Sequence, residues 1–132
     1  MRRLAFAVAA ALLALPLPGS AAGDNVRPIF AAAMPNVPGK TLTAITVEYA
    51  PGGKSASHRH AGSAFIFAYV LEGEIRSALE GETPRVYKAG ETWTEPPAAH
   101  HVVSENASAT KPAKLLAIVV ADTGDTLTTV DK

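Results

Sequence analysis

The sequence predicts an all-β protein, and two features of its pattern support this fold class. In residues 41–50 (TLTAITVEYA) the odd-numbered side chains share one face, and this two-residue period with many β-branched residues is typical of a strand. Turn-forming residues then recur about every 8–12 residues, and no segment has a convincing helical period. This spacing predicts a sandwich or barrel of short strands.

Each expected strand is bounded by residues that turn the chain. The first ends at 51–54 (PGGK). The apolar run 64–71 (AFIFAYVL) also fits a short buried helix by periodicity alone, but its aromatic residues and the Glu-Gly that stops it favour a strand. Further strands are expected at 74–80 (EIRSALE), 85–88 (RVYK), 92–95 (TWTE), 100–106 (HHVVSEN) and 114–122 (KLLAIVVAD).

The chain of 132 residues, 48% of them hydrophobic, is long enough for one domain with a sizeable core. We assign this domain to residues 41–121. Residues 23–40 contain three prolines and predict an irregular N-terminal arm, and residues 122–132 predict a C-terminal tail.

The first 22 residues have the organisation of a secretory signal peptide. A basic head precedes an apolar run broken by prolines, and the small residues GSAA predict cleavage after Ala22. A membrane anchor is the alternative, but about 12 uninterrupted apolar residues are too few to span a bilayer, which needs about 20. No cysteine is present to carry a lipid. We therefore expect a periplasmic or secreted protein with no stable membrane association after cleavage.

Charge and cysteine content exclude several classes of function. The 12 basic residues balance the 12 acidic ones, and removal of Arg2 and Arg3 leaves 10 basic residues against 12. This balance argues against nucleic acid or an anionic membrane as a partner. The absence of cysteine excludes disulfides, thiolate metal ligands and cysteine nucleophiles.

The four histidines form two pairs, His58/His60 and His100/His101. Residues i and i+2 of a strand point to the same face, so the first pair can present two imidazoles to one metal ion. Adjacent residues point to opposite faces, so only one member of the second pair can join them. Either pair alone is more often a surface feature, because imidazole is also an ordinary polar surface group.

The order and spacing of these residues resemble the cupin superfamily. A glycine, five residues and His-x-His, with a later glycine, match the first cupin motif at 52–73. A glycine, five residues, Pro-x-x, two residues and a histidine match the second motif at 90–101. The resemblance covers roughly residues 41–121 and implies a double-stranded β-helix, or jelly-roll barrel. It also implies a metal ion at the barrel mouth, held by His58, His60 and His101.

The sequence departs from the cupin pattern at several positions. The glutamate of the first motif would stand at Ala64 or Phe65, or at Ile66 when counted back from the later glycine, and none of these can bind a metal. In the second motif Ala98 replaces a glycine, and Glu105, followed by Asn106, replaces an asparagine. The resemblance therefore implies a site of three histidines.

Three neutral imidazoles suit Zn(II), Fe(II), Ni(II) or Cu(II), and they leave coordination positions open for water or substrate. Without the carboxylate, the site is one charge more positive, which favours an anionic ligand and disfavours manganese. His101 fits the motif spacing better than His100 does. If His101 faces inward, Val103 shares its face, and His100 points outward with Val102.

Other residues give weaker signals. Glu95 could act as a general base or support a ligating histidine, although a solvated charge at a strand end is the more common role. Tyr49, Tyr69 and Trp93 could line the barrel, but strand aromatics are more often core residues. Arg59 lies between two candidate ligands and should point away from them.

Three functions fit these observations. The first is a metalloenzyme of small molecules, such as a three-histidine dioxygenase, the second a noncatalytic module that binds or senses a small ligand or metal, and the third a structural cupin without metal. No acid/base pair is evident, so we assign no catalytic residues. A homodimer is one expected assembly, because cupins often dimerise through strand exchange.

Overall fold

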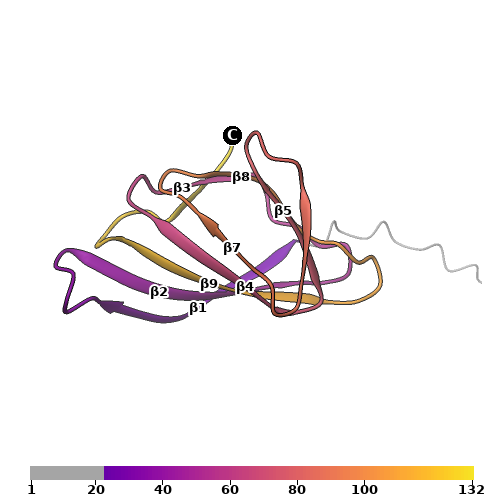
Figure 1. Cartoon of the computed structure of the whole chain (residues 1–132), viewed down its shortest axis with the longest axis horizontal. Helices are drawn as coiled ribbons and strands as arrows, with labels where there is room; N and C mark the ends of the chain where they lie inside the picture. Colours follow the sequence, from indigo (N-terminus) through magenta and orange to yellow (C-terminus); the bar gives the residue numbers. More distant parts are fainter. Residues whose placement is uncertain (1–22) are drawn as a thin grey trace, which may run out of the picture.

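The computed structural model describes residues 23–132, and the predicted signal peptide lies outside them. These residues form ten strands, so the all-β prediction is confirmed (Figure 1). Within residues 23–132, no helix is long and apolar enough to cross a membrane. The strands are β1 (Asp24–Ala33), β2 (Lys40–Tyr49), β3 (His58–His60), β4 (Phe65–Glu72), β5 (Glu74–Leu79), β6 (Arg85–Lys88), β7 (Thr92–Glu95), β8 (His100–Asn106), β9 (Ala113–Asp122) and β10 (Thr128–Val130).

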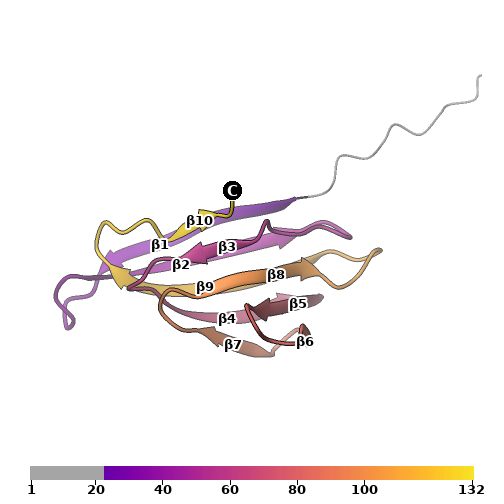
Figure 2. The ribbon, with the colours of Figure 1, turned by 90° about the horizontal axis from the view of Figure 1, so that it is seen from above.

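The strands form two antiparallel sheets of five strands each. Their orders are β1-β2-β9-β4-β7 and β10-β3-β8-β5-β6. Figure 1 shows the sheets as two layers, and Figure 2 shows that the strands of one sheet lie over those of the other in matching order. This is the predicted double-stranded β-helix, and its core lies between the two layers.

Strand β4 shows why the apolar run at 64–71 is a strand. Its inward side chains are almost completely buried, whereas its outward side chains are exposed, which is the two-residue alternation of a strand rather than the stripe of a helix. Tyr69 is among the outward residues and does not line the barrel. The buried residues are Ile66, Ala68 and Val70, and the exposed ones are Phe65, Phe67, Tyr69 and Leu71.

The prediction of an irregular arm at residues 23–40 is wrong for most of that segment. Residues Asp24–Ala33 form β1, which pairs antiparallel with β2 along its length. The register shifts between Pro28 and Phe30, where a β-bulge or irregularity interrupts the pairing. Because β1 is the outer strand of its sheet, a proline without an amide donor is tolerated there. The prolines therefore suggested a loop where an edge strand exists.

The predicted C-terminal tail also contains a strand. The short strand β10 pairs antiparallel with β3, so that Thr128 lies opposite His60 and Val130 lies opposite His58. Strand β3 is only three residues long, and it is bonded on one side to β10 and on the other to β8. The tail thus secures the strand that carries two of the predicted ligands.

The turn between β4 and β5 requires glycine. Gly73 has a φ of +69°, and a Cβ atom there would lie 2.5 Å from the carbonyl oxygen of Pro112. We expect Gly73→Ala to lower the free energy of unfolding by at least about 2 kcal/mol, because it combines a left-handed conformation with a steric clash against backbone. Urea denaturation followed by the fluorescence of Trp93, the single tryptophan, measures this loss.

Gly81→Ala is the matched control for this substitution. Gly81 has a φ of +84°, but no heavy atom lies within 4 Å of its added Cβ. It should therefore lose only the conformational part, about 1 kcal/mol. Equal losses in the two variants would show that the close approach to Pro112 is unimportant.

Candidate metal centre

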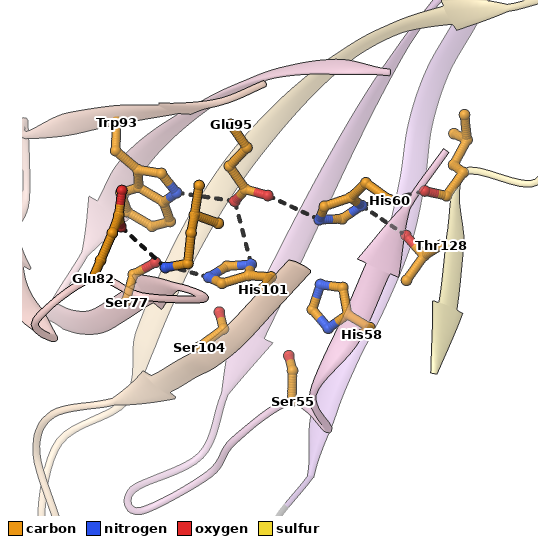
Figure 3. A network of polar contacts seen from close by, with 12 residues as sticks. Ser55, His58, His60, Ser77, Glu82, Trp93, Glu95, His101, Ser104 and Thr128 are labelled. Carbon is orange, nitrogen blue, oxygen red and sulfur yellow. Dashed lines mark hydrogen bonds and ion pairs between the residues drawn. The ribbon is translucent and has the colours of Figure 1, made fainter. Parts of the chain in front are cut away.

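The pairing of β3 with β8 brings three of the four histidines together. His58 lies directly opposite His101, and His60 follows two residues later on the same face. The ring centroid of His58 lies 4.8 Å from that of His60 and 5.1 Å from that of His101. One nitrogen from each ring lies within 4.8 Å of the others, so the three predicted ligands form a cluster that could hold a metal ion (Figure 3).

Backbone carbonyls orient the two histidines of β3. His58 Nδ1–H donates to the carbonyl of Ala56 at 2.7 Å, and His60 Nδ1–H donates to the carbonyl of Leu127 at 3.2 Å. A carbonyl can only accept, so in each neutral ring the proton is on Nδ1 and Nε2 carries a lone pair. Metal-binding histidines are commonly held in this way, with the second nitrogen donating to a backbone carbonyl or carboxylate.

His101 is the most buried of the three histidines. It is 5% exposed, and its Nε2 lies 2.8 Å from the hydroxyl of Ser77 on β5. Burial lowers the pKa of His101 to about 4, although the negative charge of Glu95 acts in the opposite direction. The ring is therefore neutral at pH 7, which is the state that binds metals.

His100 lies outside the cluster, as its predicted orientation requires. Its Nε2 lies 2.7 Å from Oδ2 of Asp131 and 3.3 Å from the hydroxyl of Ser57. The hydrogen bond with Asp131 raises the pKa of His100 above its ordinary value. The ring thus joins β8 to the segment that follows β10, on the outer side of the sheet. Arg59 is likewise exposed and points away from the cluster.

The prediction that Val103 shares the face of His101 is wrong. The pairing with β5 shifts between Ala78 and Leu79, so β8 contains one extra residue, a β-bulge at 102. Ser104 therefore faces inward with His101 and lines the same cavity. The bulge also accounts for Asn106, which stands one position after the expected asparagine: its buried side chain donates to the carbonyls of Ala50 and Lys111.

The motif glycine replaced by Ala98 lies in the tight turn before β8. Ala98 has a φ of +63°, in the region that favours glycine, and Ala99 N–H donates to the carbonyl of Pro96 at 3.1 Å. The turn geometry expected of the motif is therefore kept with an alanine at some conformational cost. It places His101 at the start of β8.

Glu95 is not the solvated strand-end charge that the sequence favoured. It is 2% exposed, because β7 pairs with β4 and this residue, opposite Ile66, faces the interior. Its Oε1 accepts a hydrogen bond from Trp93 Nε1 at 3.0 Å and lies 3.2 Å from His101 Nδ1. Its Oε2 lies 2.9 Å from His60 Nε2 (Figure 3). Glu95 thus contacts two of the three clustered histidines.

The carboxyl group of Glu95 is ionised in this environment. Burial raises its pKa, but the contacts with His60, His101 and Trp93 outweigh burial and hold the pKa below its ordinary value. The cluster therefore contains one negative charge. The sequence led us to expect a more positive site that favours anionic ligands and disfavours manganese. That expectation assumed a site without a carboxylate, and this assumption is wrong because Glu95 lies beside the histidines.

A cavity of about 310 Å³ lies between the sheets and is open to the histidine cluster. Most of its wall is apolar, and the largest share of the apolar side chains comes from the inward faces of β2, β4 and β9. Tyr49 and Trp93 also line it, so two of the three aromatic candidates belong to the cavity wall. The Tyr49 hydroxyl lies 2.8 Å from the hydroxyls of both Ser55 and Ser104 and adds a polar group to that wall.

The donor atoms of this site fit a divalent transition metal ion. Imidazole nitrogen and carboxylate oxygen are ligands that Zn(II), Fe(II), Mn(II) and Cu(II) accept. Oε2 of Glu95 is buried and has no hydrogen-bond partner, although it lies beside His60. A cation at this position would satisfy an otherwise unpaired buried charge.

Comparison with solved structures supports the same fold. An uncharacterized conserved protein with a double-stranded β-helix domain from Klebsiella pneumoniae subsp. pneumoniae MGH 78578 is 16% identical, with a TM-score of 0.66 over 89% of each chain. The protein TT1209 from Thermus thermophilus is 26% identical, with a TM-score of 0.59 over 74% of this chain and 83% of its own.

A recombinant oxalate oxidase in complex with glycolate is 27% identical, with a TM-score of 0.53. The match covers 59% of this chain and 41% of the oxidase, so this chain spans less than half of that protein. No curated protein gives a significant match. The Cupin domain family matches residues 45–119, which is more than half of the chain, and the protein therefore belongs to the cupin family.

Proposed function

We propose that the protein is an exported metalloprotein that binds one divalent transition metal ion through His58, His60 and His101. In this proposal the adjoining cavity holds a small molecule in contact with that ion. One observation carries the proposal: three imidazole nitrogens lie within 4.8 Å of one another and open onto a largely apolar cavity. Imidazole nitrogens are common ligands of divalent transition metals, and three of them at this spacing can bind one ion together.

The residues of the chain supply orientation and exclusion of water. The carbonyls of Ala56 and Leu127 hold the rings of His58 and His60, and burial keeps His101 neutral. The apolar wall of the cavity lowers the local dielectric around any ligand. A bound ion would add Lewis acidity, and Fe(II) or Cu(II) would also provide redox chemistry with oxygen.

The expected ligand is small and has an apolar body with at least one oxygen-bearing group. The cavity of about 310 Å³ is at the lower end of the range for small-molecule sites, about 300–1,000 Å³. The hydroxyls of Tyr49, Ser55 and Ser104, which lie within hydrogen-bond distance of one another, form a polar group in the apolar wall. The similar oxalate oxidase was solved with glycolate, which supports a small oxygenated ligand and a dioxygenase-like or oxidase-like reaction.

The first prediction concerns metal content. Protein comprising residues 23–132 should carry about one equivalent of a transition metal, and His101→Ala should weaken Zn(II) binding by at least about 100-fold, as should His58→Ala. Loss of a supporting partner alone costs about 10–100-fold, so loss of a ligand should cost more. Isothermal titration calorimetry on metal-depleted protein measures these affinities.

His100→Ala is the matched control, since it removes the adjacent imidazole, which points outward. It should bind Zn(II) within a few-fold of the unmodified protein. A protein that binds no metal would support the structural role instead. Normal binding by His101→Ala with none by His100→Ala would reverse the assignment.

The second prediction separates an enzyme from a binding module. Protein loaded with Fe(II) should consume oxygen in the presence of a member of a panel of small hydroxy acids, dicarboxylates and phenols. The same preparation of the His58→Ala/His60→Ala variant should not. An oxygen electrode measures the rate, and binding of a panel member without turnover would favour the noncatalytic module.

We also propose export, supported by the basic head, the short apolar run and the GSAA segment before residue 23. Expression of the full chain in a secretion-competent host should yield a protein that begins at Gly23. Intact mass spectrometry of the exported fraction tests this. A mature species that retains Met1–Ala22 would contradict it.

A further inference from the structure

We propose that Glu95 is a fourth protein ligand of the metal ion, supplied by β7. This inference rests on the metal binding proposed above, and it adds to that site a donor that the three-histidine cluster does not include. It also changes the character of the site, because one donor becomes an anionic oxygen. Four features of the structure support it: an unpaired buried oxygen, the spacing of the donor atoms, the position of Glu95 in the sheet, and its contact with Trp93.

The first feature is the contact between Glu95 and His60. Oε2 of Glu95 lies 2.9 Å from Nε2 of His60, yet it is buried and has no hydrogen-bond partner. A buried anionic oxygen without a partner is unfavourable. A metal ion held between this oxygen and the ring nitrogen would satisfy both atoms.

The second feature is the spacing of these atoms. Two donors that occupy adjacent positions around an ion, each at about 2.0–2.2 Å from it, lie about 2.8–3.6 Å apart, from octahedral to tetrahedral angles. The observed distances are 2.9 Å between Oε2 and His60 Nε2 and 3.2 Å between Oε1 and His101 Nδ1. The free atom Oε2 therefore lies at ligand spacing from His60, while Oε1, which accepts from Trp93, lies beside His101.

The third feature is the register of β4 and β7. Glu95 is the cross-strand partner of Ile66, and both residues face the cavity. Side chains of directly opposed residues have their Cβ atoms about 4.5–5.5 Å apart, so either position can deliver a carboxylate to the same region. The position on β4 is occupied by the apolar Ile66, and the carboxylate is supplied by Glu95 on the neighbouring strand β7.

The fourth feature is the way in which the carboxylate is held. Trp93 precedes Glu95 by two residues on β7 and donates to Oε1, while its ring packs 4.7 Å from that of Tyr87. This contact fixes the carboxylate and leaves Oε2 as the free atom. The arrangement favours a ligand that binds through one oxygen.

The experiment compares metal binding by Glu95→Gln and by the unmodified protein. Glutamine has the same shape and can still accept the hydrogen bond from Trp93, so the fold should be retained. We expect the affinity for Zn(II) to fall by at least about 100-fold, more than loss of a supporting contact costs, and binding of Mn(II) to be lost because that ion prefers carboxylate ligands. Glu91→Gln, which removes an exposed carboxylate four residues earlier, should leave both affinities unchanged.

A second variant tests the position directly. In Ile66→Glu/Glu95→Ile the carboxylate moves to the opposite strand, and the double variant should recover most of the affinity that Glu95→Gln loses. A crystal structure of the Zn(II)-loaded unmodified protein should place a Glu95 oxygen about 2.0–2.2 Å from the metal.

The outcomes separate this inference from the proposed function. If the unmodified protein binds no metal, the proposed function fails and this inference fails with it. If it binds metal and Glu95→Gln binds equally well, the three-histidine site stands and the role of Glu95 is wrong. A loss of about 100-fold or less, with the carboxylate more than about 3 Å from the metal in the crystal structure, would show that Glu95 only positions a histidine.

Discussion

The antiparallel pairing of β3 with β8 is the constraint on which the site depends. Strand β3 has three residues, and its register with β8 sets His58 opposite His101. A shift of one residue would turn His58 and His60 toward solvent and replace them with Arg59, because side chains alternate between faces. The pairing with β10 on the other edge and the hydrogen bond from His60 to Leu127 make that shift costly. The position of two candidate ligands is therefore determined by backbone pairing on both sides.

The buried carboxylate of Glu95 is the second feature on which the arrangement of the barrel interior depends. A charge that is 2% exposed is unfavourable unless neighbouring groups satisfy it, and here an indole N–H donates to Oε1 while Oε2 has no hydrogen-bond partner. The apolar side chains of the two sheets leave a cavity beside this polar group rather than closing over it. The interior thus contains two packed apolar clusters, one around Val70 and Ile75 and one around Ile66 and Val119, together with a cavity that carries the histidines and the carboxylate.

Much of the fold follows from local sequence pattern. The strands at 85–88, 92–95 and 100–106 begin and end where their turn residues predict. The strand at 24–33 was missed because its prolines indicate a loop, whereas an edge strand tolerates them. Local pattern also gave no indication of the extra residue in β8, because a bulge is defined only by the partner strand.

The histidine cluster follows from motif spacing, but the role of Glu95 does not. The motif spacing predicts a carboxylate shortly after His60 in the chain. The residues at the possible positions are Ala64, Phe65 and Ile66, and none of them has a carboxylate. The carboxylate instead comes from a residue much later in the chain, which reaches the same place through the pairing of β4 with β7. The Trp-x-Glu pattern of β7 was the available signal. Residues i and i+2 of a strand share a face, so a large aromatic side chain that faces the interior implies that the glutamate faces the interior too.

The carbonyl that orients His60 belongs to a residue 67 positions further along the chain, and this separation has a consequence for the order of folding and metal loading. Contacts between residues so far apart form late, since the loop between them must first be closed. An unfolded or partly folded chain therefore carries two histidines on a mobile segment, without the partners that orient them. A metal ion bound as proposed would therefore bind selectively only after the barrel has closed, and it would then stabilise the closed state.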